Sequence, residues 1–204
     1  MLIRTNIFFF AILITILSCQ DEGKQTVSEK EQKEDHIFCQ MSSESTGIDF
    51  ANPINEDLVK NYTLLKYEYL YNGAGVAIGD INNDGLPDLY FSGNMVDDRL
   101  YLNKGGFQFE DISEKAGIRT GSSWSTGVNM VDINQDGLLD IYVCKAGPDN
   151  NEQDRKNLCF INKGDLTFEE KAEEMGLQDI GIGVQSVFFD MDKDGDLDCY
   201  VSNE

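Results

Sequence analysis

The stretch DINNDGLPD, at residues 80–88, decides the fold of this chain. It recurs as DINQDGLLD at residues 132–140 and as DMDKDGDLD at residues 190–198. We name these copies loops 1, 2 and 3 and number the positions in each from 1 to 9. Every copy has oxygen-bearing side chains at positions 1, 3, 5 and 9, and glycine at position 6. Such a set suits Ca2+, which takes about six to eight oxygen ligands, and the glycine lets the backbone turn sharply around the ion.

We expect the ligands of each ion to be the side chains at positions 1, 3, 5 and 9 and the backbone carbonyl at position 7. The sequence thus predicts about three Ca2+ ions in this chain. Mg2+ demands a smaller octahedral site and usually keeps waters, so it is the weaker candidate. The predicted ligands are Asp80, Asn82, Asp84, Leu86 (carbonyl) and Asp88 in loop 1, Asp132, Asn134, Asp136, Leu138 (carbonyl) and Asp140 in loop 2, and Asp190, Asp192, Asp194, Asp196 (carbonyl) and Asp198 in loop 3.

Loop 3 differs from the other two copies in its charge. It has four ligand carboxylates where loops 1 and 2 have three and an asparagine. Because the number of charged ligands helps to set affinity, loop 3 is expected to bind its ion most tightly. The alternative interpretation is an acidic turn rich in Asn, Asp and Gly. A turn alone, however, does not require a third and a fourth carboxylate in register.

Short runs rich in β-branched and aromatic residues flank each loop, such as 76–78 before loop 1 and 89–91 after it. These runs predict strands, so each loop is expected to join the two strands of a hairpin. After loops 1 and 2, two more such runs surround an Asn-Lys-Gly turn, at 103–105 and 162–164, which favours a second hairpin. One repeat is therefore four strands in about 50 residues, the size of a β-propeller blade.

The flanking strands also exclude an EF-hand. That loop needs a bidentate Glu at position 12 and a helix on each side. Counted from the start of each copy, position 12 is here Phe91, Val143 or Val201, which are all apolar strand residues. The aspartate at position 9 is therefore expected to be the carboxylate that closes each site.

The segments GVAIGDINNDGLPDLYFSGN, RLYLNKGGFQFEDISEKAGI and STGVNMVDINQDGLLDIYV resemble the FG-GAP/VCBS repeat family. More narrowly, they resemble bacterial lipoproteins related to cartilage acidic protein, and the resemblance covers residues 46–204. It implies an all-β fold, a β-propeller of four-stranded blades with Ca2+ in the hairpin loops, as in integrin α subunits. It also implies a secreted or surface protein that is concerned with binding.

The third repeat is shorter than the first two. Repeats 1 and 2 continue into a second hairpin, whereas the sequence stops at Glu204, soon after loop 3. We therefore expect a partial propeller of about two and a half blades, too few to close a ring of about four to eight. The expectation is an N-terminal fragment of a longer protein. The alternative is that another copy or another chain completes the ring.

Residues 1–19 are typical of a secretion signal, with a basic residue near the start and an apolar run too short to span a bilayer. The run ends in ILSC, which resembles the lipobox of bacterial lipoproteins and predicts lipidation of Cys19. An ordinary signal peptide with an incidental cysteine is the alternative. The acidic residues that follow resemble the tag that sends some lipoproteins to the outer face of the outer membrane. Residues 20–45 are polar and predict a flexible tether to a propeller at 46–204.

The formal net charge of −21 restricts the possible partners. Nucleic acids and anionic membranes both require basic patches, so neither is expected to bind the folded part. Contact with the membrane is expected through the lipid anchor only. The remaining expectation is a protein or glycan ligand, whose identity the sequence does not indicate.

Three other residues leave alternatives open. Trp124 could stack on a sugar at the surface or pack between blades. Cys144 and Cys159 fall on strands expected to be neighbours, so they could form a disulfide in an oxidising compartment or be small buried residues. The spacing of the cysteines and of the single histidine is not typical of zinc.

No motif in the sequence indicates catalysis, and no residue is predicted to be catalytic. The function expected is that of a calcium-binding, lipid-anchored β-propeller at the cell surface, acting as a protein or glycan binding and adhesion module. One alternative is a scaffold within a larger surface enzyme whose catalytic residues lie beyond residue 204. Another is an accessory subunit of an outer-membrane complex.

Overall fold

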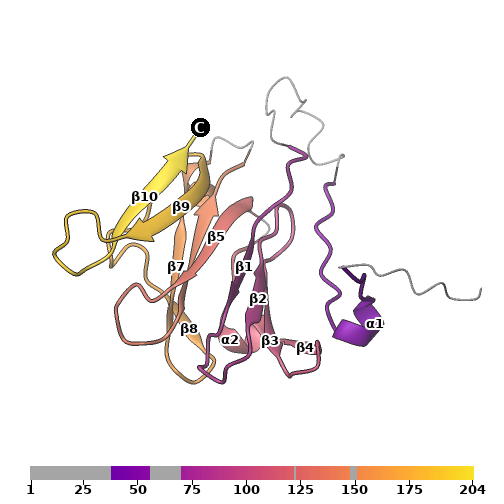
Figure 1. The fold of residues 1–204 in the computed structure, drawn as a ribbon. Helices are drawn as coiled ribbons and strands as arrows, with labels where there is room; N and C mark the ends of the chain where they lie inside the picture. The colour runs from indigo at the N-terminus through magenta and orange to yellow at the C-terminus, as the bar shows by residue number, and fades with distance from the viewer. Residues whose placement is uncertain (1–37, 56–69, 122, 148–150) are drawn as a thin grey trace, which may run out of the picture. The chain divides into compact units, whose positions relative to one another are not determined.

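The structure is a computed structural model that describes residues 38–55, 70–121, 123–147 and 151–204 (Figure 1). All its helices and strands fall within one compact unit, Gln40–Glu204. The predicted signal peptide, Cys19 and the first part of the predicted tether lie outside the described residues. No helix in the described ranges is long and apolar enough to cross a membrane.

Among the described residues, ten short strands make three antiparallel sheets, and the prediction of an all-β fold with four-stranded blades is confirmed. Three short helical turns, α1 (Ser43–Thr46), α2 (Ser113–Ala116) and η1 (Glu152–Arg155), connect or precede them. Blade 1 has the strand order β1 (Val76–Gly79), β2 (Asp88–Phe91), β3 (Arg99–Asn103), β4 (Phe109–Asp111). Blade 2 has the strand order β5 (Ser125–Val131), β6 (Asp140–Lys145), β7 (Leu158–Asn162), β8 (Phe168–Glu170). Blade 3 consists of β9 (Gly183–Phe189) and β10 (Asp198–Asn203).

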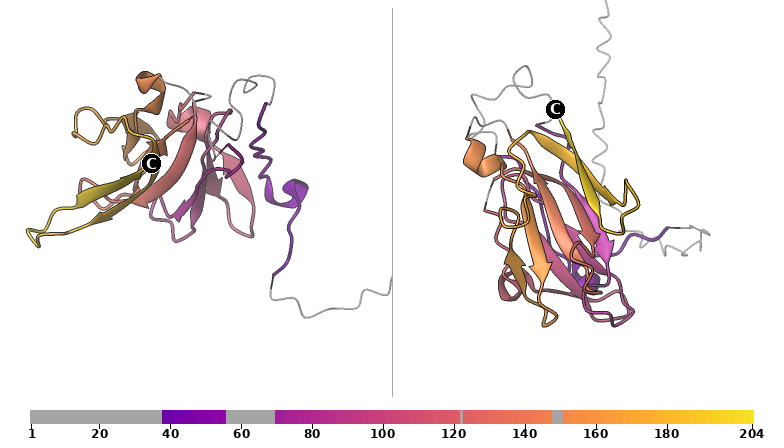
Figure 2. Two further views of the ribbon diagram at one scale, coloured as in Figure 1. Left: turned by 90° about the horizontal axis from the view of Figure 1, so that it is seen from above. Right: turned by 90° about the vertical axis from the view of Figure 1, so that its left-hand side faces the viewer.

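Each predicted calcium loop joins the first two strands of its blade. The residue before the loop pairs with the aspartate at position 9 in every copy: Gly79 with Asp88, Val131 with Asp140, and Phe189 with Asp198. The first strands of the blades are neighbours, since β1 contacts β5 and β5 contacts β9. Figures 1 and 2 show the three hairpins side by side, with their loops leaving toward one end of the sheets.

Apolar side chains between the sheets form the core. Alternate residues of a strand face opposite sides of its sheet, so one face of blade 1 packs against blade 2. The largest cluster joins Tyr90, Leu100 and Leu102 of blade 1 to Val128, Ile141, Val143 and Phe160 of blade 2. A second cluster joins blades 2 and 3, where the rings of Tyr142 and Phe188 meet edge to face with centroids 5.3 Å apart. Burial of this apolar surface stabilises the stack of blades at roughly 25 cal/mol per Å².

The segment that precedes blade 1 packs against the sheet of blade 1. Ser42 caps α1 by accepting the backbone N–H of Ser45, and Gly47 ends the helix with a φ of 75°. A Cβ at Gly47 would collide with the carbonyl oxygen of Phe109 in β4. The ring of Phe50 stacks on that of Phe91, with centroids 5.3 Å apart. Within the described residues, regular structure thus includes α1, which starts a few residues before the predicted boundary at residue 46.

Candidate metal centres

In loop 1, candidate ligand oxygens converge on the same backbone groups. The N–H of Asp84 donates both to Oδ1 of Asp80 and to Oδ1 of Asn82, each at 3.1 Å. The N–H of Gly85 donates to the other oxygen of Asp80 at 2.7 Å. Gly85 has a φ of 85°, a conformation open to glycine at little cost. The backbone thus brings the side chains at positions 1, 3 and 5 to one side of the turn.

Loop 2 repeats this geometry with the same bonds. The N–H of Asp136 donates to Oδ1 of Asp132 and to Oδ1 of Asn134, each at 3.0 Å. The N–H of Gly137 donates to the second oxygen of Asp132 at 2.9 Å. The two loops differ in sequence at positions 4 and 8 only, and the shared arrangement is made by the residues at positions 1, 3, 5 and 6.

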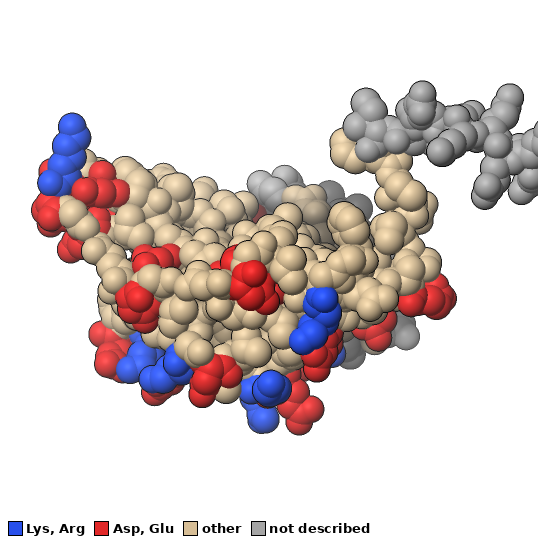
Figure 3. All heavy atoms as spheres, turned by 60° about the horizontal axis from the view of Figure 1, so that its bottom comes forward, with Lys and Arg blue, Asp and Glu red and all other residues tan. Residues whose placement is uncertain are grey.

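Loop 3 contains the densest group of carboxylates. Among the described residues, one set of three acidic side chains has ligand atoms within 4.8 Å of one another: Asp190, Asp192 and Asp194, all of them exposed. Asp198 is not part of this set. Figure 3 shows acidic side chains gathered on the projecting loop between β9 and β10, at the left of the view. Like charges at such distances repel, and a bound cation would relieve that repulsion.

Asp196 adds a fifth carboxylate to this loop. Its backbone N–H donates to Oδ1 of Asp194 at 3.1 Å and lowers the pKa of Asp194. A side-chain hydrogen bond with Asp194 in turn raises the pKa of Asp196. Of the two carboxyl groups, Asp194 is therefore the more readily ionised.

The residues at position 7 lie directly beside these carboxylates. The N–H of Leu86 donates to Asp84 at 2.8 Å, and that of Leu138 donates to Asp136 at 2.9 Å. Asp196 makes the matching bond in loop 3. Their carbonyls are thus in the right part of each loop, and their role as ligands stays a prediction.

The aspartate at position 9 has a structural role that the sequence did not predict. Asp88 is wholly buried, and its two oxygens accept the N–H groups of Ile81 at 3.0 Å and of Asn103 at 2.7 Å. Asp140 is equally buried and accepts from Ile133 and Asn162, each at 2.9 Å.

Burial raises the pKa of both carboxyl groups, and these hydrogen bonds oppose the rise. Position 9 therefore ties the loop to the third strand of its blade. Each carboxylate oxygen can accept more than one bond, so a ligand role remains open to it.

The side chains at position 4 also went unpredicted. Asn83 reaches from loop 1 to the backbone of loop 2, and Gln135 reaches from loop 2 to loop 3. Both residues have a positive φ, of 57° and 59°. The sequence signal for these contacts was the amide side chain that occurs just before the Asp-Gly pair in both loop 1 and loop 2.

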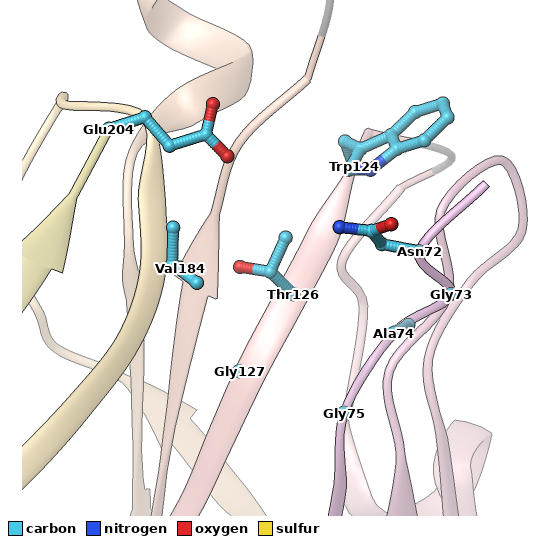
Figure 4. Close-up of a pocket in the computed structure, with 9 residues that line it drawn as sticks. All are labelled: Asn72, Gly73, Ala74, Gly75, Trp124, Thr126, Gly127, Val184 and Glu204. Carbon is cyan, nitrogen blue, oxygen red and sulfur yellow. The ribbon is translucent and has the colours of Figure 1, made fainter. Parts of the chain in front are cut away.

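A cavity of about 230 Å³ lies between the first strands of the blades, at the end opposite the loops (Figure 4). It is smaller than the roughly 300–1,000 Å³ of ordinary ligand pockets. Trp124, at its edge, is buried in a cluster with Leu70 and Ala146, which confirms packing between blades and excludes an open stacking platform. The lining consists of Asn72, Gly73, Ala74, Gly75, Trp124, Thr126, Gly127, Val184 and Glu204.

Cys144 and Cys159 are free, buried thiols in the structure. Tyr142, not Cys144, lies opposite Cys159 in the pairing of β6 with β7, so the two cysteines are diagonal to each other. Burial raises the pKa of Cys144 to about 11 and that of Cys159 to about 12. Of the two alternatives, the structure therefore shows small buried strand residues.

Part of this chain is similar in sequence to known proteins. The model of the FG-GAP-like repeat family matches residues 80–143, from loop 1 into β6. Cartilage acidic protein 1 of Xenopus tropicalis is 28% identical over 106 residues, which cover 52% of this chain and 16% of that protein. Integrin alpha-8 of Gallus gallus is 30% identical over 108 residues, which cover 46% of this chain and 10% of that protein.

Residues 80–143 are thus similar to an FG-GAP-like repeat, and the four-stranded antiparallel sheets have the form of β-propeller blades. The chain spans less than a fifth of the length of these curated relatives.

Proposed function

We propose that this chain is a calcium-stabilised part of a β-propeller that serves as a protein or glycan binding and adhesion module at the cell surface. One observation carries the calcium proposal: an array of side-chain oxygens, held by the same backbone N–H groups, is built in loop 1 and again in loop 2. Loop 3 adds three carboxylates within 4.8 Å of one another. The donors are all hard oxygens, the type that Ca2+ prefers.

The side chains at positions 1, 3 and 5 would hold the ion, with the carbonyl at position 7 and one oxygen of the buried aspartate at position 9 as further ligands. A bound divalent cation supplies positive charge, which offsets the mutual repulsion of the carboxylates. This role is structural, because the ion would brace the turn between the first two strands of each blade. We propose a binding module rather than an enzyme because a structural ion takes no part in a reaction and no motif in the sequence indicates catalysis.

Similarity to an integrin alpha subunit and to cartilage acidic protein supports a role in adhesion outside the cell. The proposed location rests on the sequence, because the signal peptide and Cys19 lie outside the described residues. Metabolic labelling with a radioactive fatty acid tests the anchor. We expect label in the natural chain and none in the Cys19→Ala variant, and label in both would rule out lipidation at this residue.

A calcium titration followed by thermal unfolding tests the proposed metal role. A ligand at free concentration c that binds only the folded state stabilises it by RT ln(1 + c/Kd), so the melting temperature rises with ligand concentration. We expect the chain to melt at a higher temperature in Ca2+ than in excess chelator. The Asp84→Ala, Asp136→Ala and Asp194→Ala triple variant serves as the control and should show no such difference. Equal melting of the natural chain in calcium and in chelator would refute the proposal.

A further inference from the structure

Side chains at position 4 of loops 1 and 2 connect consecutive loops. Nδ2 of Asn83 donates to the carbonyl oxygen of Gly137 at 3.0 Å. Nε2 of Gln135 donates to the carbonyl oxygen of Gly195 at 2.7 Å. Both acceptors are the glycine at position 6 of the next loop. Two different amide side chains therefore make the same contact across two successive blade boundaries.

The backbone at position 4 is unusual and is repeated as well. Asn83, Gln135 and Lys193 have φ values of 57°, 59° and 66°. Asparagine enters this left-handed region fairly readily, but glutamine and lysine do so only where the surroundings impose it. The positive φ is thus a feature of the loop backbone at position 4 in all three copies. In loops 1 and 2 the side-chain amide at this position contacts the next loop.

The acceptor glycine is joined to a candidate ligand by one rigid group. The carbonyl of Gly137 and the N–H of Leu138 belong to the same peptide, which is planar. That N–H donates to Oδ1 of Asp136, the carboxylate at position 5, at 2.9 Å. The peptide between Gly195 and Asp196 is arranged in the same way, and its N–H donates to Oδ1 of Asp194 at 3.1 Å.

We propose that Asn83 and Gln135 are positioning residues for the metal centre of the loop that follows their own. By holding the carbonyl end of a planar peptide, Asn83 fixes the direction of the N–H that orients the carboxylate of Asp136. Gln135 does the same for Asp194. The inference rests on the proposed calcium sites, and it makes each centre dependent on a side chain of the preceding blade.

This arrangement predicts an effect one loop away from the substitution. A residue that itself ligated the ion would affect its own loop. A positioning residue affects the next one. Glycine is the suitable replacement at position 4, because it adopts a positive φ without strain and removes only the amide. Lys193→Gly is the matched control: it makes the same backbone change in loop 3, and because it removes a positive charge beside the carboxylates, it should not weaken calcium binding by loop 3.

The test uses full-length chains in which one loop is left intact, with calorimetry of Ca2+ binding. With loop 2 intact and Asp80→Ala and Asp190→Ala in the others, Asn83→Gly should weaken binding about two- to tenfold, the effect of losing one hydrogen bond. With loop 1 intact and Asp132→Ala and Asp190→Ala in the others, the same replacement should leave the affinity unchanged. Weaker binding at loop 1 instead, or equal binding at loop 2, would overturn the proposal.

A measurement without metal separates this proposal from the calcium proposal. In chelator, hydrogen exchange at the Leu138 amide should accelerate about two- to tenfold in Asn83→Gly, because its peptide has lost the clamp. Exchange at the Leu86 amide, the same position in loop 1, should not change. If the natural chain binds no Ca2+, the proposed function fails, and the exchange at Leu138 still decides whether Asn83 orients the next loop.

Discussion

The hydroxyl of Tyr90 donates a 2.8 Å hydrogen bond to Asp98, and both side chains are fully buried in blade 1. Blade 2 keeps the tyrosine and changes its partner: the amide of Asn157 donates to the hydroxyl of Tyr142 at 3.1 Å. The hydroxyl of Tyr142 itself donates to the carbonyl oxygen of Leu177 at 2.8 Å, so the tyrosine is a donor in both blades and also an acceptor in blade 2. The carboxylate in blade 1 leaves a buried negative charge, which Lys145 of blade 2 partly offsets.

Tyr90→Phe is expected to destabilise the chain by about 1–3 kcal/mol, because it leaves the buried carboxylate of Asp98 short of one donor. Urea unfolding monitored by circular dichroism provides the measurement. Tyr200 occupies the same repeat position in blade 3 and is largely exposed. Tyr200→Phe is therefore the matched control and should change stability by less than about 0.5 kcal/mol. Similar losses for the two variants would contradict the role assigned to Tyr90.

Lys145 predicts a dependence of stability on pH. Burial lowers the pKa of its ammonium to about 8, with Asp98 opposing the shift, and the group donates to the carbonyl of Ser123 and the hydroxyl of Ser125. An unfolded lysine keeps its proton up to a pKa of about 10.4. Between these values the unfolded chain binds more protons than the folded one, so this residue's contribution to stability rises with pH.

The comparison with Lys145→Met isolates that contribution, because cysteines and tyrosines titrate in the same range in both chains. The free energy of unfolding of the natural chain, minus that of the variant, should increase as pH rises from about 8 to about 10. A difference that is flat or falls over this range would contradict the lowered pKa.

Asp88→Asn and Asp84→Asn should separate folding from metal binding. Asp88 accepts two backbone N–H groups inside the blade, and an asparagine there would turn an NH2 group toward one of them. We expect a loss of about 1–3 kcal/mol in chelator, measured by thermal or urea unfolding. Asp84 is exposed, so its substitution should change stability in chelator by less than about 0.5 kcal/mol and act only when calcium is present. Equal losses in chelator would contradict this division.

Gly47→Ala and Gly73→Ala compare two glycines of nearly equal φ, 75° and 80°. Both replacements strain the backbone, at a cost of about 1 kcal/mol. Only Gly47 lies against another strand, where a methyl group would meet the carbonyl oxygen of Phe109, whereas Gly73 faces open space. Gly47→Ala should therefore lower the melting temperature more than Gly73→Ala. The opposite order would mean that the segment before blade 1 is not bound as the structure shows.

The sequence was sufficient for the hairpins, because their signals are local. Alternating apolar residues, the Asn-Lys-Gly turns and the position-6 glycines each act within about ten residues of one another. Contacts between blades were not predictable in this way. Lys145 would be expected at the surface, and it is buried because the carbonyls of a turn and Ser125 satisfy its ammonium. The partners of Asn83 and Gln135 likewise depend on how neighbouring loops are spaced.

The bond from Asn103 to the carboxylate of Asp88 also bears on how the chain folds. It joins residues only 15 apart, whereas the bond from Asn162 to the carbonyl of Ile81 spans 81 residues across the blade boundary. Contacts of short sequence separation form with less loss of chain entropy, so each blade is expected to acquire its first three strands before it docks on its neighbour. Translation order and assembly order would then coincide, with each finished blade serving as the template for the next.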